Sequence, residues 1–197
     1  MSKTQISIRE AFAEYLTKQE EQVTQHWLEL LRRASDIDHA RALPVGVLID
    51  HLPDLYAGLC EWIRVGQRNH LNHEARDDAR QHGAQRWKIG FRLEEVLREL
   101  DLLRAVILIH VVDGFRQECR HFPSARESEL RFSIEEYFSR ISGWSIRRYV
   151  AEHEESIAAY IAQLEESNRA LRLAASQQSH EPGTPGTGVG DLSEQTR

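Results

Sequence analysis

The 197-residue chain has little cysteine and contains no long apolar run. Its two cysteines, Cys60 and Cys119, lie far apart in apolar-periodic segments, which is typical of buried thiols in a reduced compartment rather than of a disulfide or a ligand pair. No stretch approaches the roughly 20 apolar residues that a transmembrane helix needs, and residues 1–5 lack the apolar core of a secretory signal. We therefore predict a cytoplasmic protein that does not enter a membrane.

The sequence also lacks an excess of basic residues and any common catalytic motif. Its formal net charge is −6, whereas nucleic-acid-binding surfaces normally carry a marked basic excess, so no nucleic-acid partner is expected. Without a glycine-rich phosphate loop or a recognisable pairing of Ser or Cys with His, we predict that the chain is not an enzyme. The cluster His70, His73, Glu74 and Asp77 lacks the His-Glu-x-x-His order of zinc hydrolases. We interpret it as a solvated helix start and expect no metal site.

Apolar residues recur at helical spacing through most of the chain, and no pair of strands is evident. A hydrophobic content of 41% is enough for one domain with a core. The predicted fold class is therefore all-α, a single-domain helical bundle with a long C-terminal helix that meets no proline before Pro182. The expected helices cover 7–34, 44–53, 53–65, 74–88, 92–119 and 124 onward.

The last part of the chain divides into a helix and a tail. Residues 150–176 carry a seven-residue repeat, which predicts a short dimerisation or signalling coil whose core positions are Val150, Ile157, Leu164 and Leu171. The alternate positions His153, Tyr160, Ser167 and Ala174 are poor packing residues, so this coil should be weak. Residues 177–197 are rich in Pro, Gly and Thr and predict a disordered tail. The folded domain is expected to cover 1–149.

A distinctive motif lies in the middle of the chain, His82-Gly83-x-x-Arg86-x-x-x-Gly90-Phe91-x-Leu93-Glu94-Glu95-Val96-x-x-Glu99-x-x-x-Leu103-Arg104. It is preceded by a run from Leu43-Pro44 to Leu59. This order resembles the N-terminal regulatory domain of the RsbR/RsbRD co-antagonist family, a sensor module of bacterial stressosome proteins and of some soluble histidine kinases. The resemblance covers about Phe12 to Tyr149. The family usually has an aromatic residue after the central Glu, where this chain has Leu100.

The resemblance implies a fold and a function. The fold would be globin-like without haem, and the activity would be that of a non-enzymatic module that senses an input in stress-response or two-component signalling. The module would act as a homodimer and regulate a protein partner, either a kinase or a stressosome-type component. In relatives the long helix leads to an output domain, whereas here only the tail follows it.

The motif also predicts a polar network between two helices. His82 and Arg86 are one turn apart on one helix, and Glu99 and Arg104 lie on the next, so the four side chains are candidates for a shared site. Two interpretations stay open. The network either binds a signal such as a small anion, or satisfies buried hydrogen bonds and fixes the helix register.

Two alternative functions also remain. A haem- or small-ligand-binding globin-type sensor would need an apolar pocket and an axial histidine, for which His110 and His82 are the candidates. His110 interrupts an apolar stripe, which is more typical of a hydrogen-bonded core residue than of a haem ligand, so no cofactor is expected. The other alternative is a purely structural dimerisation protein.

Overall fold

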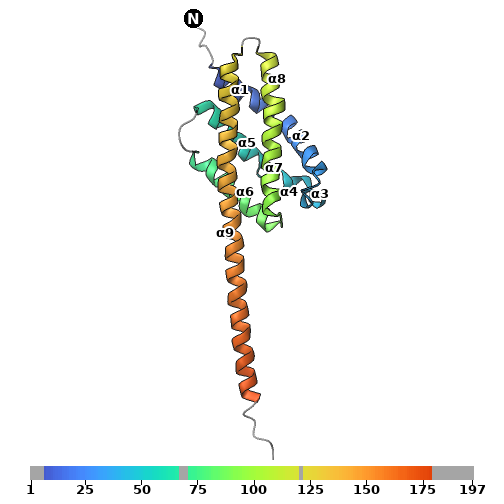
Figure 1. The fold of residues 1–197 in the computed structure, drawn as a ribbon, viewed down its shortest axis with the longest axis vertical. Coiled ribbons are helices and arrows are strands. Elements are labelled where there is room, and N and C mark those ends of the chain that lie inside the picture. The colour runs from blue at the N-terminus through green and yellow to red at the C-terminus, as the bar shows by residue number, and fades with distance from the viewer. Residues whose placement is uncertain (1–6, 67–70, 120–121, 179–197) are drawn as a thin grey trace, which may run out of the picture. The chain divides into compact units, whose positions relative to one another are not determined.

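The computed structural model describes residues 7–66, 71–119 and 122–178, and within these ranges every regular element is helical (Figure 1). The predicted all-α class is thereby confirmed, including the long C-terminal helix. No helix of the described residues is long and apolar enough to cross a membrane. In chain order the elements are α1 Ile8–Lys18, α2 Glu20–Arg33, α3 His39–Ala42, α4 Val45–Leu48, α5 Leu52–Val65, α6 His73–Lys88, α7 Leu93–Val106, the π-helix η1 Ile107–Val111, α8 Val112–Glu118 and α9 Ser124–Gln178.

The first predicted helix, over 7–34, is wrong in one respect, because the structure breaks it at Gln19 into α1 and α2. The two halves have different partners. Tyr56 of α5 donates a hydrogen bond to the Leu16 carbonyl of α1 at 2.7 Å, whereas Trp27 of α2 donates to the Glu99 carbonyl of α7 at 3.0 Å. Apolar spacing continues across both halves, so periodicity alone does not reveal the break.

The predicted helix over 92–119 is also interrupted, by the π-helix η1 between α7 and α8. A π-turn widens the helix by one residue and disturbs its regular hydrogen bonding. The Leu108 carbonyl within this turn accepts a hydrogen bond from Arg131 of α9 at 3.1 Å, and the same guanidinium binds Asp113 at 2.6 Å. A side chain distant in sequence thus donates a hydrogen bond to a backbone carbonyl of the irregular turn.

The first half of α9 packs into the core between the other helices. Trp62 of α5 donates its indole N–H to the Ser133 carbonyl at 2.9 Å. Tyr137 is fully buried and donates its hydroxyl to the Leu55 carbonyl of α5 at 2.6 Å. These two hydrogen bonds join α5 and α9, and each helix supplies one side-chain donor and one backbone acceptor.

Two glycines shape α6. A Cβ on Gly83 would lie 2.0 Å from the Ser145 carbonyl oxygen, so the close approach of α6 and α9 requires glycine there. Gly90 follows α6 with φ +86°, the left-handed conformation that the sequence predicts for the helix end.

The chain divides into two compact units, one ending at Glu154 and the other beginning at Glu155. The division falls five residues later than the predicted boundary at 149/150, because Tyr149 is buried and Val150 packs against the core of the first unit. Helix α9 contributes to both units. The predicted tail 177–197 lies outside the described residues from 179 onward.

Candidate functional site

The structure brings together three of the four residues predicted for the polar network. The Arg86 Nε atom of α6 lies 2.7 and 3.0 Å from the two carboxylate oxygens of Glu99 on α7. His82 Nε2 contacts one of these same oxygens. All three side chains are almost completely buried. One carboxylate thus receives a cation and an imidazole from the same face of the neighbouring helix.

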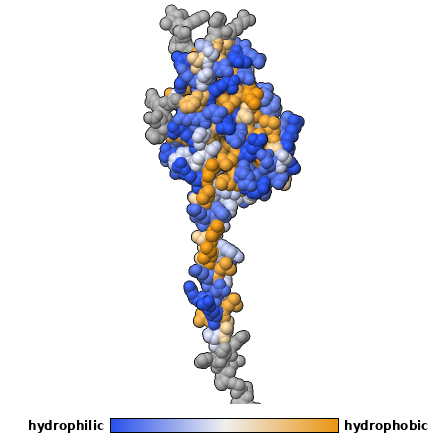
Figure 2. All heavy atoms as spheres, viewed as in Figure 1, coloured by the Kyte–Doolittle hydropathy of each residue, from blue (hydrophilic) through white to orange (hydrophobic). Residues whose placement is uncertain are grey.

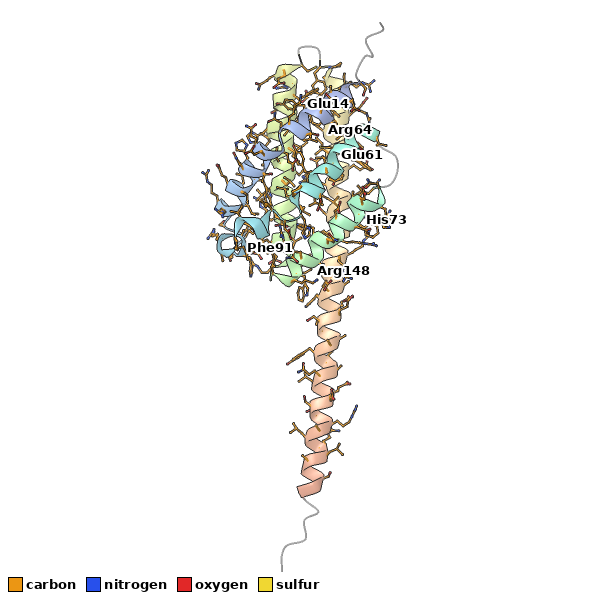
Figure 3. The ribbon with its side chains drawn as sticks, turned by 180° about the vertical axis from the view of Figure 1, so that it is seen from behind. Glu14, Glu61, Arg64, His73, Phe91 and Arg148 are labelled. Carbon is orange, nitrogen blue, oxygen red and sulfur yellow. The ribbon has the colours of Figure 1, made fainter. Side chains whose placement is uncertain are left out.

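The outer atoms of this network reach three further elements. The Arg86 guanidinium donates to the backbone carbonyls of Leu48 at 2.7 Å and Val47 at 3.3 Å. These carbonyls lie at the end of α4, where a short helix leaves acceptors unpaired. Arg86 also stacks over Phe91, labelled in Figure 3 in the turn between α6 and α7, with its guanidinium carbon 5.2 Å from the ring centroid. Arg86 therefore connects α6 to the end of α4 and to the turn between α6 and α7.

On its other side the network extends to α9. The Nδ1 atom of His82 lies 2.9 Å from the hydroxyl oxygen of Ser145, which is buried. Sequence reasoning missed Ser145, although a signal was present. Ser145 lies four residues after Ile141 and four before Tyr149, so helical spacing places it on the buried face. A buried serine on that face needs a polar partner.

The charges of the network stabilise one another. Burial raises the pKa of the Glu99 carboxyl, but the Arg86 guanidinium and His82 more than offset this effect, so the pKa lies below its ordinary value. Glu99 is therefore an ionised acceptor at neutral pH. His51 approaches the edge of the network with its ring centroid 6.5 Å from that of His82, and burial lowers its pKa.

Space at the network is too small for a ligand. A cavity of about 10 Å³ lies against His82, Arg86 and Glu99, and this volume holds at most about one water molecule. The small-anion interpretation finds no room there, and neither does a haem with His82 as its axial ligand. The arrangement instead fits a helix-register device built from satisfied polar groups.

Arg104 does not join the network, which corrects the fourth predicted position. It forms ion pairs with Asp101 and with Glu135 of α9, each at 3.0 Å, on a partly exposed surface. The reason is helical geometry, because five residues at about 100° each place Arg104 roughly 140° around the helix from Glu99.

His110 lies within η1 and is exposed, whereas Ile107 and Val111 of the same π-helix are buried. Its ring stacks on that of His26 from α2, with centroids 4.7 Å apart. An exposed ring with a stacked neighbour does not provide the apolar pocket that a haem requires. In the described part of the chain, His82 thus lies beside a cavity of about 10 Å³ and His110 lies on the surface.

A second buried carboxylate, Glu95, was also missed by sequence reasoning. It accepts hydrogen bonds from the backbone N–H groups of Asp38 and Arg92, both at 2.8 Å, and one oxygen lies 2.8 Å from His39 Nδ1. Burial alone would raise its pKa, but these partners lower it to about 2. Glu95 thus joins the start of α7 to the start of α3.

An arginine-rich groove lies on the surface between α6 and α9. The guanidinium carbons of Arg76, Arg80 and Arg147 lie 5.0, 4.7 and 4.7 Å from the centroid of the Trp144 indole. Arg76 and Arg147 form no ion pair with another described residue, and the Arg76 Nε atom is buried without an acceptor there. Arg80, Trp144 and Arg147 line a hollow of about 610 Å³, together with Lys88, Arg148 and Glu152. We name this feature the arginine groove.

The predicted coil positions divide between the two units. Val150 is partly buried and packs against the core of the first unit, unlike the other three predicted positions. Ile157, Leu164 and Leu171 are exposed by 46%, 44% and 68%. Ile161, which the prediction omitted, is exposed by 49%. Apolar residues along the second half of α9 are visible in Figure 2.

These observations define two features of α9, a buried end of the polar network in the first unit and an exposed apolar stripe in the second.

Cys60 and Cys119 are both free thiols, and burial raises the pKa of Cys60.

No family model, curated protein or solved structure matches the chain.

Proposed function

We propose that the chain is a non-enzymatic bacterial signalling module that acts in the cytoplasm as a homodimer and passes a change in helix packing to a protein partner. The observation that carries this proposal is the continuity of α9 from Ser124 to Gln178. One residue of this helix, Ser145, binds the buried network, and the same helix carries the exposed apolar stripe. A globin-like arrangement and a place in stress-response or two-component signalling are parts of the proposal that rest on the family resemblance.

The buried network supplies a way to couple packing to association. At Gly83 the α6 backbone lies so close to the Ser145 carbonyl that a Cβ would overlap it, so α6 and α9 are closely packed there. A close-packed contact of this kind changes between discrete arrangements. An input that favours one arrangement would also favour one state of α9, and thermodynamic linkage makes the effect reciprocal.

The proposal is tested by asking whether the buried network controls self-association. Sedimentation velocity of the full chain gives the dimer dissociation constant for the native protein and for Glu99→Gln, which removes the charge but leaves the α9 stripe untouched. We expect a change of at least about fivefold, the lower end of typical coupling energies. Arg104→Met is the matched control, because Arg104 lies on the same helix outside the network, and it should change the constant by less than about twofold.

The outcomes separate the proposed function from a purely structural dimerisation protein. An unchanged dissociation constant in Glu99→Gln, together with an intact fold by circular dichroism, would refute the coupling and favour the structural alternative. A native chain that stays monomeric at all concentrations would refute the homodimer itself.

For the protein partner we propose an acidic segment that binds the arginine groove. A guanidinium stacked on an indole can still donate from its N–H edge to a carboxylate or phosphate; Arg147 forms no ion pair with another described residue, whereas Arg80 already pairs with Asp77 at 3.3 Å. The groove concentrates positive charge on a chain whose net charge is −6, so charge complementarity favours an acidic partner.

Two double variants test this surface. One carries Arg80→Glu and Arg147→Glu, and the matched control carries Arg32→Glu and Arg33→Glu. Both double variants change the net charge by the same amount, but only the first alters the groove. A partner recovered with the native chain should lose at least about tenfold in affinity to the first variant and little to the second. Equal losses would show that overall charge, not the groove, determines binding.

A further inference from the structure

The exposed stripe of α9 follows a heptad register that differs from the predicted one. Residues 157, 161, 164, 168, 171 and 175 are separated alternately by four and three positions, the spacing of a coiled-coil seam. In this register Ile157, Leu164 and Leu171 occupy the d positions. Ile161, Asn168 and Ala175 occupy the a positions. The weak residues Tyr160, Ser167 and Ala174 leave the core and become flanking g positions.

In the predicted register, residues that pack well in a coiled-coil core alternate with residues that pack poorly. In the new register the seam is apolar except at its centre. Ile161 at an a position followed by Leu164 at a d position is a combination that favours two-stranded parallel coils. The seam from 157 to 175 is about 28 Å long at 1.5 Å per residue. All of its side chains are exposed in the isolated chain. A lone helix of this length is only marginally stable in water, so a partner helix would stabilise it.

Asn168 is the one polar residue in the seam, and it identifies the occupant. Its side chain forms no hydrogen bond with another described residue. Against an apolar partner helix its amide would be buried without a partner, which costs free energy. A second copy of the same residue satisfies it, because one amide donates where the other accepts.

Only one arrangement of two copies brings Asn168 opposite itself. In an antiparallel pair every a residue faces a d residue, so Asn168 would face Ile157, Leu164 or Leu171. In a parallel pair shifted by one heptad it would face Ile161 or Ala175. The parallel, in-register pair is the remaining arrangement, and Asn168 then meets Asn168.

Charged residues beside the seam are compatible with this arrangement. In a parallel pair each g residue faces the e residue of the next heptad on the partner helix. Tyr160 then faces Glu165, and Ser167 faces Arg172. No two like charges meet, so the flanking positions oppose neither the parallel orientation nor the register.

We infer that residues 155–178 form a parallel, in-register coiled coil with a second copy of this chain, and that the Asn168–Asn168 pair selects this arrangement. The inference deepens the proposed function, on whose homodimer it rests. It adds an orientation to the dimer, because parallel α9 helices place the two copies of the first unit at the same end of the coil.

The first experiment locates the interface with charges placed on and off the seam. Leu164→Glu should raise the dimer dissociation constant by more than about tenfold in sedimentation velocity. Its neighbour Gln163→Glu adds the same charge at an outward c position and should change the constant by less than about twofold. Circular dichroism should show a folded first unit in both variants, since Leu164 does not belong to that unit.

The second experiment tests orientation by disulfide formation in full chains that also carry Cys119→Ser. Ala175→Cys places a thiol at an a position, where the Cα atoms of a parallel in-register pair lie within the range that a disulfide spans. It should cross-link rapidly to its copy, whereas Ala170→Cys, at an outward c position, should not. The antiparallel arrangement would place residue 175 opposite residue 157, so Ala175→Cys alone would not cross-link.

The third experiment removes the selecting residue. Asn168→Ile should tighten association by roughly tenfold or more while reducing Ala175→Cys cross-linking and allowing larger assemblies, because the seam then no longer favours one register. Ala170→Ile, which adds the same side chain off the seam, should do neither. Tighter association with unchanged orientation would show that Asn168 does not select the register.

The results distinguish this inference from the proposed function. A dimer that dissociates in Leu164→Glu but fails to cross-link through Ala175→Cys would overturn the parallel register and leave the homodimer in place. A dimer that survives Leu164→Glu would overturn the coil and move the interface to the first unit. A native chain that never dimerises would overturn both.

Discussion

Replacing Arg86 by methionine tests whether the buried network depends on charge. The change keeps much of the apolar side-chain volume but removes the cation that lies 2.7 and 3.0 Å from the Glu99 oxygens. Glu99 is 1% exposed, so its carboxylate cannot recover hydration from water. Removing one partner of a buried ion pair typically costs about 3–5 kcal/mol.

That cost is a large share of the total stability of a domain of this size, which is about 5–15 kcal/mol. It corresponds to a fall in Tm of roughly 6–20 °C, at 2–4 °C for each kcal/mol. The carbonyls at the end of α4 also lose a donor, which adds to the cost. Arg104→Met provides the control, because the exposed ion pairs of Arg104 should contribute at most about 1 kcal/mol.

The assay is urea unfolding followed by circular dichroism, with both substitutions made in a Leu164→Glu background so that dimer dissociation does not contribute. The pH dependence gives a second readout. In the native chain the lowered pKa of Glu99 means that its contribution is present above the ordinary carboxyl pKa and is lost as the pH falls through the folded value. In Arg86→Met burial should raise that pKa instead, so the deficit relative to the native chain should shrink in acid.

The reasoning would be refuted if Arg86→Met cost no more than Arg104→Met, or if its deficit were the same at pH 4 and pH 7. The first result would mean that water or rearranged side chains compensate the buried charge. The second would mean that the loss arises from packing rather than from Glu99.

Three other predictions concern the first unit. Gly83→Ala should lower stability by about 1–3 kcal/mol in urea unfolding, because its Cβ would overlap the α9 backbone; Gly143→Ala, which meets open space, should instead be neutral or stabilising by up to about 1 kcal/mol, so equal losses would argue against overlap. Glu95→Gln should cost about 3 kcal/mol at pH 7, because the folded pKa of about 2 lies below the ordinary value; this deficit should disappear between pH 4.5 and pH 2, and a pH-independent deficit would contradict it. Tyr137→Phe should cost about 1–3 kcal/mol by thermal unfolding, because the buried Leu55 carbonyl loses its donor, and an unchanged Tm would show that another donor replaces it.

Helical periodicity predicted the elements where one side of a helix faces one partner. The bounds of α6 and the start of α9 follow from their apolar spacing, and Gly90 ends its helix as expected. The break at Gln19 was not predictable in this way, because the same apolar spacing serves α5 before the break and α7 after it. In the π-turn at Ile107–Val111, the Leu108 carbonyl accepts a hydrogen bond from Arg131, a residue distant in sequence that periodicity does not reveal.

In the candidate site, too, helical spacing predicted some of the residues and missed others. The spacing of His82, Arg86 and Glu99 was enough to predict their meeting, because they lie on consecutive helices joined by a short turn. Arg104 failed because a five-residue step turns a side chain away from Glu99, which the residue numbers alone are enough to show. Ser145 was within reach of the same method, whereas the carbonyls that Arg86 binds at the end of α4 carry no sequence signal.

A polar network at the meeting point of helices is an inefficient way to gain stability. Desolvating Glu99, Arg86 and His82 costs free energy that their attraction repays only in part, and well-packed apolar residues of similar volume often do as well or better. Such a network makes one helix register more favourable than the others, because its hydrogen bonds are satisfied in that register and broken in a neighbouring one. Asn168 has the same property in the proposed coil, where it would weaken association and select one alignment. The network contacts α9 through Ser145, and Asn168 lies on α9, so both features that favour specificity over stability involve this helix. If the proposed function holds, this placement would let a change of helix alignment in the first unit reach the coil through α9, whereas a purely structural dimer would use the same residues only to fix one alignment.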